Sequence, residues 1–185
     1  MAQTWRVARV SSDRNPRPLD RAGVERLAIA YVGRYATTRA KLAAYLARKV
    51  RERGWTGAEA PETALEAITA RCAELGYIDD RAFAEARAAS LTRRGYGARR
   101  VADALRAAGI EEEDAAPARQ EADASAWDAA VAFARRRRIG AFAAEPADPD
   151  RRRRALAAMM RAGHPLSIAR RLVDASPGEL PECGT

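Results

Sequence analysis

The sequence predicts an all-α protein made of tandem three-helix, helix-turn-helix-like repeats that form an elongated, curved array. Alanine supplies about a quarter of the 185 residues, and Ala, Leu, Arg and Glu are all strong helix formers. β-branched residues never alternate over a strand-length run. A spacing also recurs, in which a turn or cap residue is followed four positions later by an aliphatic residue and after four more by Leu. Because units this small cannot bury an apolar face alone, we expect them to stack. The three occurrences are Thr38/Leu42/Leu46, Gly97/Val101/Leu105 and His164/Ile168/Leu172.

Pro, Gly and Asp residues divide the chain into short predicted helices. A Pro at the first turn of a helix and a Gly just past its end are typical of these boundaries. Residues 140–149 are expected to form a loop. The helices are expected over residues 20–34, 38–53, 61–75, 80–93, 98–108, 112–138, 150–162 and 164–175.

Caps and core positions follow from the same pattern. Thr37 or Thr38 can cap the second helix, and Asp79 or Asp80 can cap the fourth. The side chains expected in the core of the middle unit are Tyr77, Phe83, Tyr96, Val101 and Leu105.

The predicted domain organisation consists of three helical repeats between two flexible ends. The third repeat is expected to be truncated, because only two helices follow the loop at 140–149. The predicted parts are a flexible segment over 1–18, a first repeat over 19–76, a second over 77–139, the truncated third over 140–176 and a flexible tail over 177–185.

The charge of the chain is strongly basic. It carries 33 Lys and Arg against 25 Asp and Glu, a formal net charge of +8, and the only lysines are Lys41 and Lys49. Such an excess indicates a polyanion or an acidic protein surface as partner. No stretch approaches the roughly 18 apolar residues of a membrane span, and the N-terminus lacks the apolar core of a secretory signal. We therefore expect a cytoplasmic protein. We also expect it to be a monomer.

Residues that could support catalysis or bind a metal are few. One His and two distant cysteines, Cys72 and Cys183, cannot build a zinc site of the usual spacing, and we expect free thiols. Asp79 and Asp80 could serve acid–base or metal chemistry, but helix capping explains them better. His164 lies at a helix start, which disfavours the imidazolium form. We therefore expect no enzyme, no metal and no cofactor.

Arginine clusters are the candidate binding residues. One cluster brackets the turn at 95–97, one ends the helix before residue 139, and one opens the helix near residue 150. Positive charge at a helix start is mildly unfavourable, so the last cluster has the weakest structural explanation. Guanidinium groups suit phosphates and carboxylates alike. The candidates are Arg93, Arg94, Arg99, Arg100, Arg135, Arg136, Arg137, Arg138, Arg151, Arg152, Arg153 and Arg154.

The middle unit also resembles a known family. It reads GYIDDRAFAEA over residues 76–86 and RGYGARRV over residues 94–101, followed by Leu105 and Gly109. This run closely resembles the signature of the bacterial RecX regulatory proteins, and YATTRAKL over 35–42 and RAGHP over 161–165 are similar to that family's outer repeats. The resemblance covers residues 20–175.

The resemblance implies a function without catalytic residues. It implies binding to the RecA recombinase, docking into the groove of the RecA–DNA filament, and restraint of filament growth, ATP hydrolysis and strand exchange, hence an effect on DNA repair, recombination and the SOS response. Our hypothesis is that the candidate arginines line the concave face of the array. Because Asn and Gln are scarce, any DNA binding should be weak, backbone-driven and salt-sensitive. The alternative is a DNA-binding transcriptional regulator, in which residues 80–108 form a helix-turn-helix.

Overall fold

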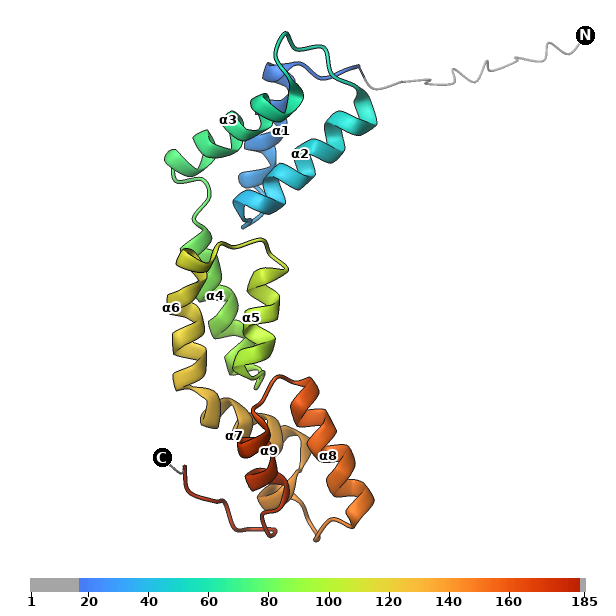
Figure 1. Cartoon of the computed structure of the whole chain (residues 1–185), viewed down its shortest axis with the longest axis vertical. Helices are drawn as coiled ribbons and strands as arrows, with labels where there is room; N and C mark the ends of the chain where they lie inside the picture. Colours follow the sequence, from blue (N-terminus) through green and yellow to red (C-terminus); the bar gives the residue numbers. More distant parts are fainter. Residues whose placement is uncertain (1–16, 184–185) are drawn as a thin grey trace, which may run out of the picture.

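The computed structural model describes residues 17–183, which fold into nine α-helices, one 3₁₀ helix and no β-strand (Figure 1). The predicted all-α fold is confirmed. Apart from the predicted 112–138 helix, the expected helix ends agree with the observed ones within two residues. The expected flexible segment 1–18 lies almost entirely outside the described residues. The elements are α1 (Arg21–Val32), α2 (Arg39–Arg53), α3 (Pro61–Glu74), α4 (Asp80–Arg93), α5 (Ala98–Arg106), α6 (Glu112–Ala124), α7 (Ala126–Arg137), η1 (Gly140–Phe142), α8 (Pro149–Arg161) and α9 (Leu166–Val173).

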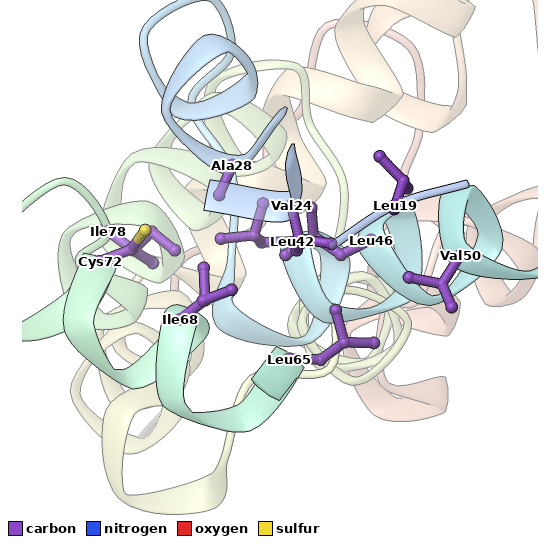
Figure 2. Close-up of a cluster of buried hydrophobic side chains, with 10 residues drawn as sticks. All are labelled: Leu19, Val24, Ala28, Leu42, Leu46, Val50, Leu65, Ile68, Cys72 and Ile78. Atoms are coloured by element: carbon purple, nitrogen blue, oxygen red, sulfur yellow. The ribbon is translucent and has the colours of Figure 1, made fainter. Parts of the chain in front are cut away.

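The first bundle consists of α1, α2 and α3. Thr38 caps α2, and its side chain accepts a hydrogen bond from the backbone N–H of Lys41 at 3.2 Å. Leu42 and Leu46 follow at helical spacing and are fully buried, as the repeated pattern predicts. Val24 of α1 and Ile68 of α3 close the core around them (Figure 2).

The second bundle consists of α4, α5 and α6. Its core joins Leu91, Val101 and Leu105 to a row of buried alanines. Small side chains let α4 and α6 approach closely, which is how an alanine-rich sequence still packs densely. The alanines are Ala84, Ala88, Ala108, Ala115, Ala118 and Ala122.

The third bundle consists of α7, α8 and α9, and it corrects two expectations. The predicted single helix over 112–138 is wrong, since the chain breaks at Ser125 between α6 and α7. Phe133 of α7 shares a buried cluster with Met159 of α8 and Leu172 of α9. The unit expected as truncated therefore has three helices, and α7 is the first of them. The sequence around Ser125 holds no Gly or Pro, and at this break the main packing partner changes from α4 to α9.

The expected core of the middle unit is mostly confirmed. Val101 and Leu105 are buried, and Phe83 and Tyr96 are half-buried against the second core. The prediction that Tyr77 belongs to this core is wrong, because 54% of its surface is exposed. After the turn at residue 76 it is Ile78 that enters the core of the first bundle.

The three bundles follow one another along a bent line, with α2, α5 and α8 on the inner side of the bend in the view of Figure 1. Thr38 links the first bundle to the second, since its hydroxyl donates a hydrogen bond to the buried carbonyl of Ala108 at 2.7 Å. Asp80 accepts from the backbone N–H and the Nε of Arg39 at 3.0 and 3.1 Å in the same junction. No helix in the described part of the chain is long and apolar enough to cross a membrane.

Candidate functional site

Two tight turns meet where the second bundle contacts the third. The backbone N–H of Gly97, before α5, donates to the carbonyl of Ala162, after α8, at 2.9 Å. A Cβ at Gly97 would overlap the carbonyl of Gly163, whose own φ of +94° favours glycine. Backbone against backbone is possible here only because both positions lack a side chain. This contact brings the arginines of the α4–α5 turn beside those of α7 and α8.

The first groove at this junction is lined by five arginines from both bundles. Tyr96 and Phe133 supply its aromatic surface, with the guanidinium carbons of Arg94 and Arg136 each 5.5 Å from the nearer ring centroid. Arg136 also donates to the backbone carbonyl of Arg94, which fixes its position. Among the described residues, no Asp or Glu lines this groove. The five are Arg94, Arg100, Arg136, Arg137 and Arg161.

A second groove continues from the first along α8. The two share Arg137 and Ala158 in their linings, so they lie side by side and carry the same charge. Glu145 is the one carboxylate in the lining of this second groove within the described residues. We call the combined feature the arginine groove. Its members are Arg94, Arg100, Arg136, Arg137, Arg138, Arg151, Arg152, Arg154 and Arg161.

The start of α8 explains how a helix tolerates four consecutive arginines at its positive end. Asp148 caps the helix by accepting from the backbone N–H of Arg151 at 2.7 Å, and this hydrogen bond lowers the pKa of the carboxyl. Asp150 in the first turn pairs with Arg153 at 2.9 Å. The two acids stabilise the helix start. Arg153 is therefore held by its neighbour, while Arg151, Arg152 and Arg154 line the groove.

Eight of the twelve predicted arginines thus line the groove, and four lie elsewhere. Arg93 lies between α4 and α6, in a separate groove with Glu85 and Glu121. Arg99 donates to the carbonyl of Met160 at 2.9 Å. Arg135 stands 5.1 Å from the centroid of the Phe142 ring, and Arg153 is in its ion pair.

Arg161 lines the groove but is absent from the predicted set. It follows Arg154 by seven residues, which is two helical turns, so the two lie on the same face of α8. This spacing was present in the sequence. Adjacent arginines point to different faces of a helix, whereas residues three, four and seven apart share one face.

The candidate acid–base residues are occupied by structural contacts. His164 is buried, and its Nε2 lies 3.1 Å from the carbonyl of Gly95. Asp79 caps α4 as expected, accepting from the N–H of Ala82 at 2.8 Å. Asp80 is buried in its ion pair with Arg39. The described residues hold no cluster of three or more His, Cys, Asp or Glu able to bind a metal.

Comparison with known proteins agrees with this architecture. Residues 79–118, which span α4, α5 and part of α6, match the family model described as RecX, second three-helix domain. The chain is 35% identical over 172 residues to the regulatory protein RecX of Myxococcus xanthus, covering 89% of this chain and 91% of that protein. Two crystal structures share the fold. RecX from Lactobacillus salivarius has a TM-score of 0.58 at 15% identity, covering 80% of this chain and 91% of that one.

The second crystal structure, of a regulatory protein RecX, has a TM-score of 0.59 at 21% identity and covers 83% of this chain and 71% of that one. The structures support the helical array, and the identity to the Myxococcus xanthus protein over most of both chains carries the assignment. The chain belongs to the RecX family of regulatory proteins.

Proposed function

We propose that this protein binds the RecA recombinase filament and restrains filament growth, ATP hydrolysis and strand exchange, and that the arginine groove carries the contact. The observation that supports this most directly is the groove itself, whose lining within residues 17–183 contains nine arginines and one carboxylate. Protein surfaces usually interleave opposite charges. Nine neighbouring arginines that form no ion pair within residues 17–183 therefore favour an anionic partner.

A recombinase filament on DNA suits this surface, because it presents protein carboxylates and DNA phosphates along one continuous groove. Guanidinium forks bind both groups in a bidentate manner. An elongated array of three bundles can also follow a filament over several subunits. DNA binding without RecA is then weak, non-specific and salt-dependent.

The transcriptional-regulator alternative has less support. In a helix-turn-helix, the N-terminal residues of the second helix reach the bases of the major groove. Here the start of α5 is packed on the third bundle through Gly97 and Arg99. On the outer face, Arg106 is paired with Asp103 at 2.9 Å.

The test is the single-stranded-DNA-dependent ATPase of the cognate RecA, with this protein added from sub-stoichiometric amounts upward. We expect inhibition well below one copy per recombinase. Replacing Arg151, Arg152 and Arg154 together by Glu should weaken inhibition at least about tenfold, since three cations of the groove become anions. Acidic residues at a helix start are favourable, so the variant should still fold, which circular dichroism can verify.

The matched control replaces Arg93 and Arg153 by Glu, because both are exposed but lie outside the groove. It should inhibit like the unaltered protein. Equal inhibition by the groove variant would contradict the assignment of the contact. No effect of the unaltered protein on the ATPase, with footprinting of one defined duplex sequence instead, would favour the regulator.

A further inference from the structure

A basic groove separate from the arginine groove lies on the first bundle, between the end of α1 and the outer face of α2. Three tyrosines gather in it. The rings of Tyr31 and Tyr45 are stacked, with centroids 4.3 Å apart and planes 22° apart. The ring of Tyr35 packs against that of Tyr31, with the ring centroids 5.3 Å apart, and 52% of the surface of Tyr35 is exposed. The stacked pair therefore supports an aromatic ring that remains open to solvent.

Cations surround these rings. The guanidinium carbon of Arg34 lies 5.8 Å from the ring centroid of Tyr35. Arg48 stands 5.6 Å from the ring of Tyr45 and also pairs with Glu52. Arg34 and Arg51 form no ion pair within residues 17–183. No Asp or Glu of the described chain lines the groove.

We infer that this groove binds single-stranded nucleic acid, with one base stacked on Tyr35 and the neighbouring phosphates on Arg34 and Arg51. An exposed aromatic face among unpaired cations is the combination that single strands require, because every base offers a π-face and every nucleotide a phosphate. An acidic protein would use the cations but not the ring. A duplex would present its phosphates while its bases stay stacked on one another.

This site is distinct from the arginine groove. It lies on α1 and α2, at the opposite end of the array from α7 and α8 (Figure 1). The inference goes beyond the proposed function, because it concerns direct contact with nucleic acid and does not require RecA. A chain with such a site could hold a strand at one end while the other end engages an acidic surface.

The experiment is fluorescence anisotropy of the full chain with a labelled thymidine oligonucleotide, beside an abasic strand of the same length and charge. Tyr35→Ala should bind the thymidine strand at least about fivefold more weakly, since base–aromatic stacking contributes about 1–3 kcal/mol per base. Tyr35→Phe keeps the ring and should restore binding. All three proteins should bind the abasic strand equally, because the phosphates are unchanged.

Tyr77→Ala is the matched control. Tyr77 is 54% exposed on the same bundle, but its groove contains Glu25. This variant should bind both strands normally. Replacing Arg34 and Arg51 by Ala should weaken binding to both strands. It should also reduce the slope of log K against log salt concentration by the amount expected for about two phosphate contacts.

Three results would overturn the inference: unchanged thymidine binding by Tyr35→Ala, an equal loss on the abasic strand, or displacement of the labelled thymidine strand by polyglutamate as efficiently as by the unlabelled thymidine strand. The RecA ATPase of Tyr35→Ala keeps this outcome separate from the proposed function. If the variant still inhibits RecA while failing on thymidine, only the nucleic-acid site is involved. If thymidine binding and RecA inhibition are both unchanged in Tyr35→Ala, the inference fails and the proposed role of the arginine groove is unaffected.

Discussion

The imidazole Nε2 of His164 lies 3.1 Å from the carbonyl oxygen of Gly95, and this buried contact joins the third bundle to the second. A carbonyl only accepts, so Nε2 carries the proton, while the buried Nδ1 has no partner among the described residues. Burial lowers the pKa of His164, and the hydrogen bond to Gly95 opposes this only in part. The junction is therefore built for the neutral imidazole.

Stability should depend on pH through His164. Because its pKa in the folded protein is below the ordinary 6.5, the unfolded chain binds more protons once the pH falls below 6.5. The free energy of unfolding should fall by up to about 1.4 kcal/mol per pH unit from there down to the lowered pKa. Urea unfolding at pH 7.5 and 5.5 measures this.

His164→Gln can keep a donor toward Gly95 but cannot titrate. Its unfolding free energy should change less between pH 7.5 and 5.5 than that of the unaltered protein. An identical pH dependence in the two proteins would show that other groups cause it.

Gly97→Ala should destabilise the protein by at least about 2 kcal/mol, because the new Cβ would overlap the backbone carbonyl of Gly163, which cannot move aside like a side chain. The φ of Gly97 is −77°, which any residue adopts, so the cost comes from the contact. Gly76→Ala is the comparison, since Gly76 has a φ of +73° but nothing within 4 Å of its Cβ position. Its cost should be about 1–2 kcal/mol of backbone strain.

The order of these two glycine variants is the informative result. Backbone conformation alone would make Gly76→Ala the more damaging change. Chemical denaturation of both proteins under the same conditions ranks them, and a larger loss for Gly76→Ala would argue against a tight contact between the two turns.

Asp80→Ala should lower the free energy of unfolding by about 2 kcal/mol. It removes two hydrogen bonds to Arg39 and leaves a backbone N–H without its acceptor at the junction of the first two bundles. Asp80→Asn keeps an acceptor and should lose about half as much. Asp103→Ala, which breaks only the exposed pair with Arg106, should change stability by less than about 0.5 kcal/mol. Similar losses for Asp80→Ala and Asp103→Ala would contradict this role.

Arg138 combines an unfavourable backbone with a place in the arginine groove. It ends α7 with a φ of +54° and a ψ of +51°, the left-handed region that favours glycine. Arg138→Gly should therefore stabilise the fold by about 1 kcal/mol. It should also weaken inhibition of the RecA ATPase, because a groove cation is lost. Arg138→Lys keeps the charge and the strain, and should do neither; thermal unfolding and the ATPase assay report the two effects separately.

Much of this protein follows from local sequence alone. Alanine-rich helices, the cap at Thr38, the cap at Asp79 and the buried leucines at four-residue spacing are set by neighbours within one or two turns. Such interactions act over short stretches of chain, so they can be predicted from the order of the residues. The family motif over 76–101 is of the same kind.

The assignment of α7 and the shape of the groove required the tertiary structure. The sequence around Ser125 holds no Gly or Pro, and the packing of Phe133 against Met159 and Leu172 makes α7 part of the third bundle. That same packing sets Arg136 beside Arg94, 42 residues earlier in the chain, with Arg137 in the same groove, and leaves Arg93 on another face. Which arginines share a surface depends on how whole helices pack, and such contacts between distant residues leave no periodic signal in the chain.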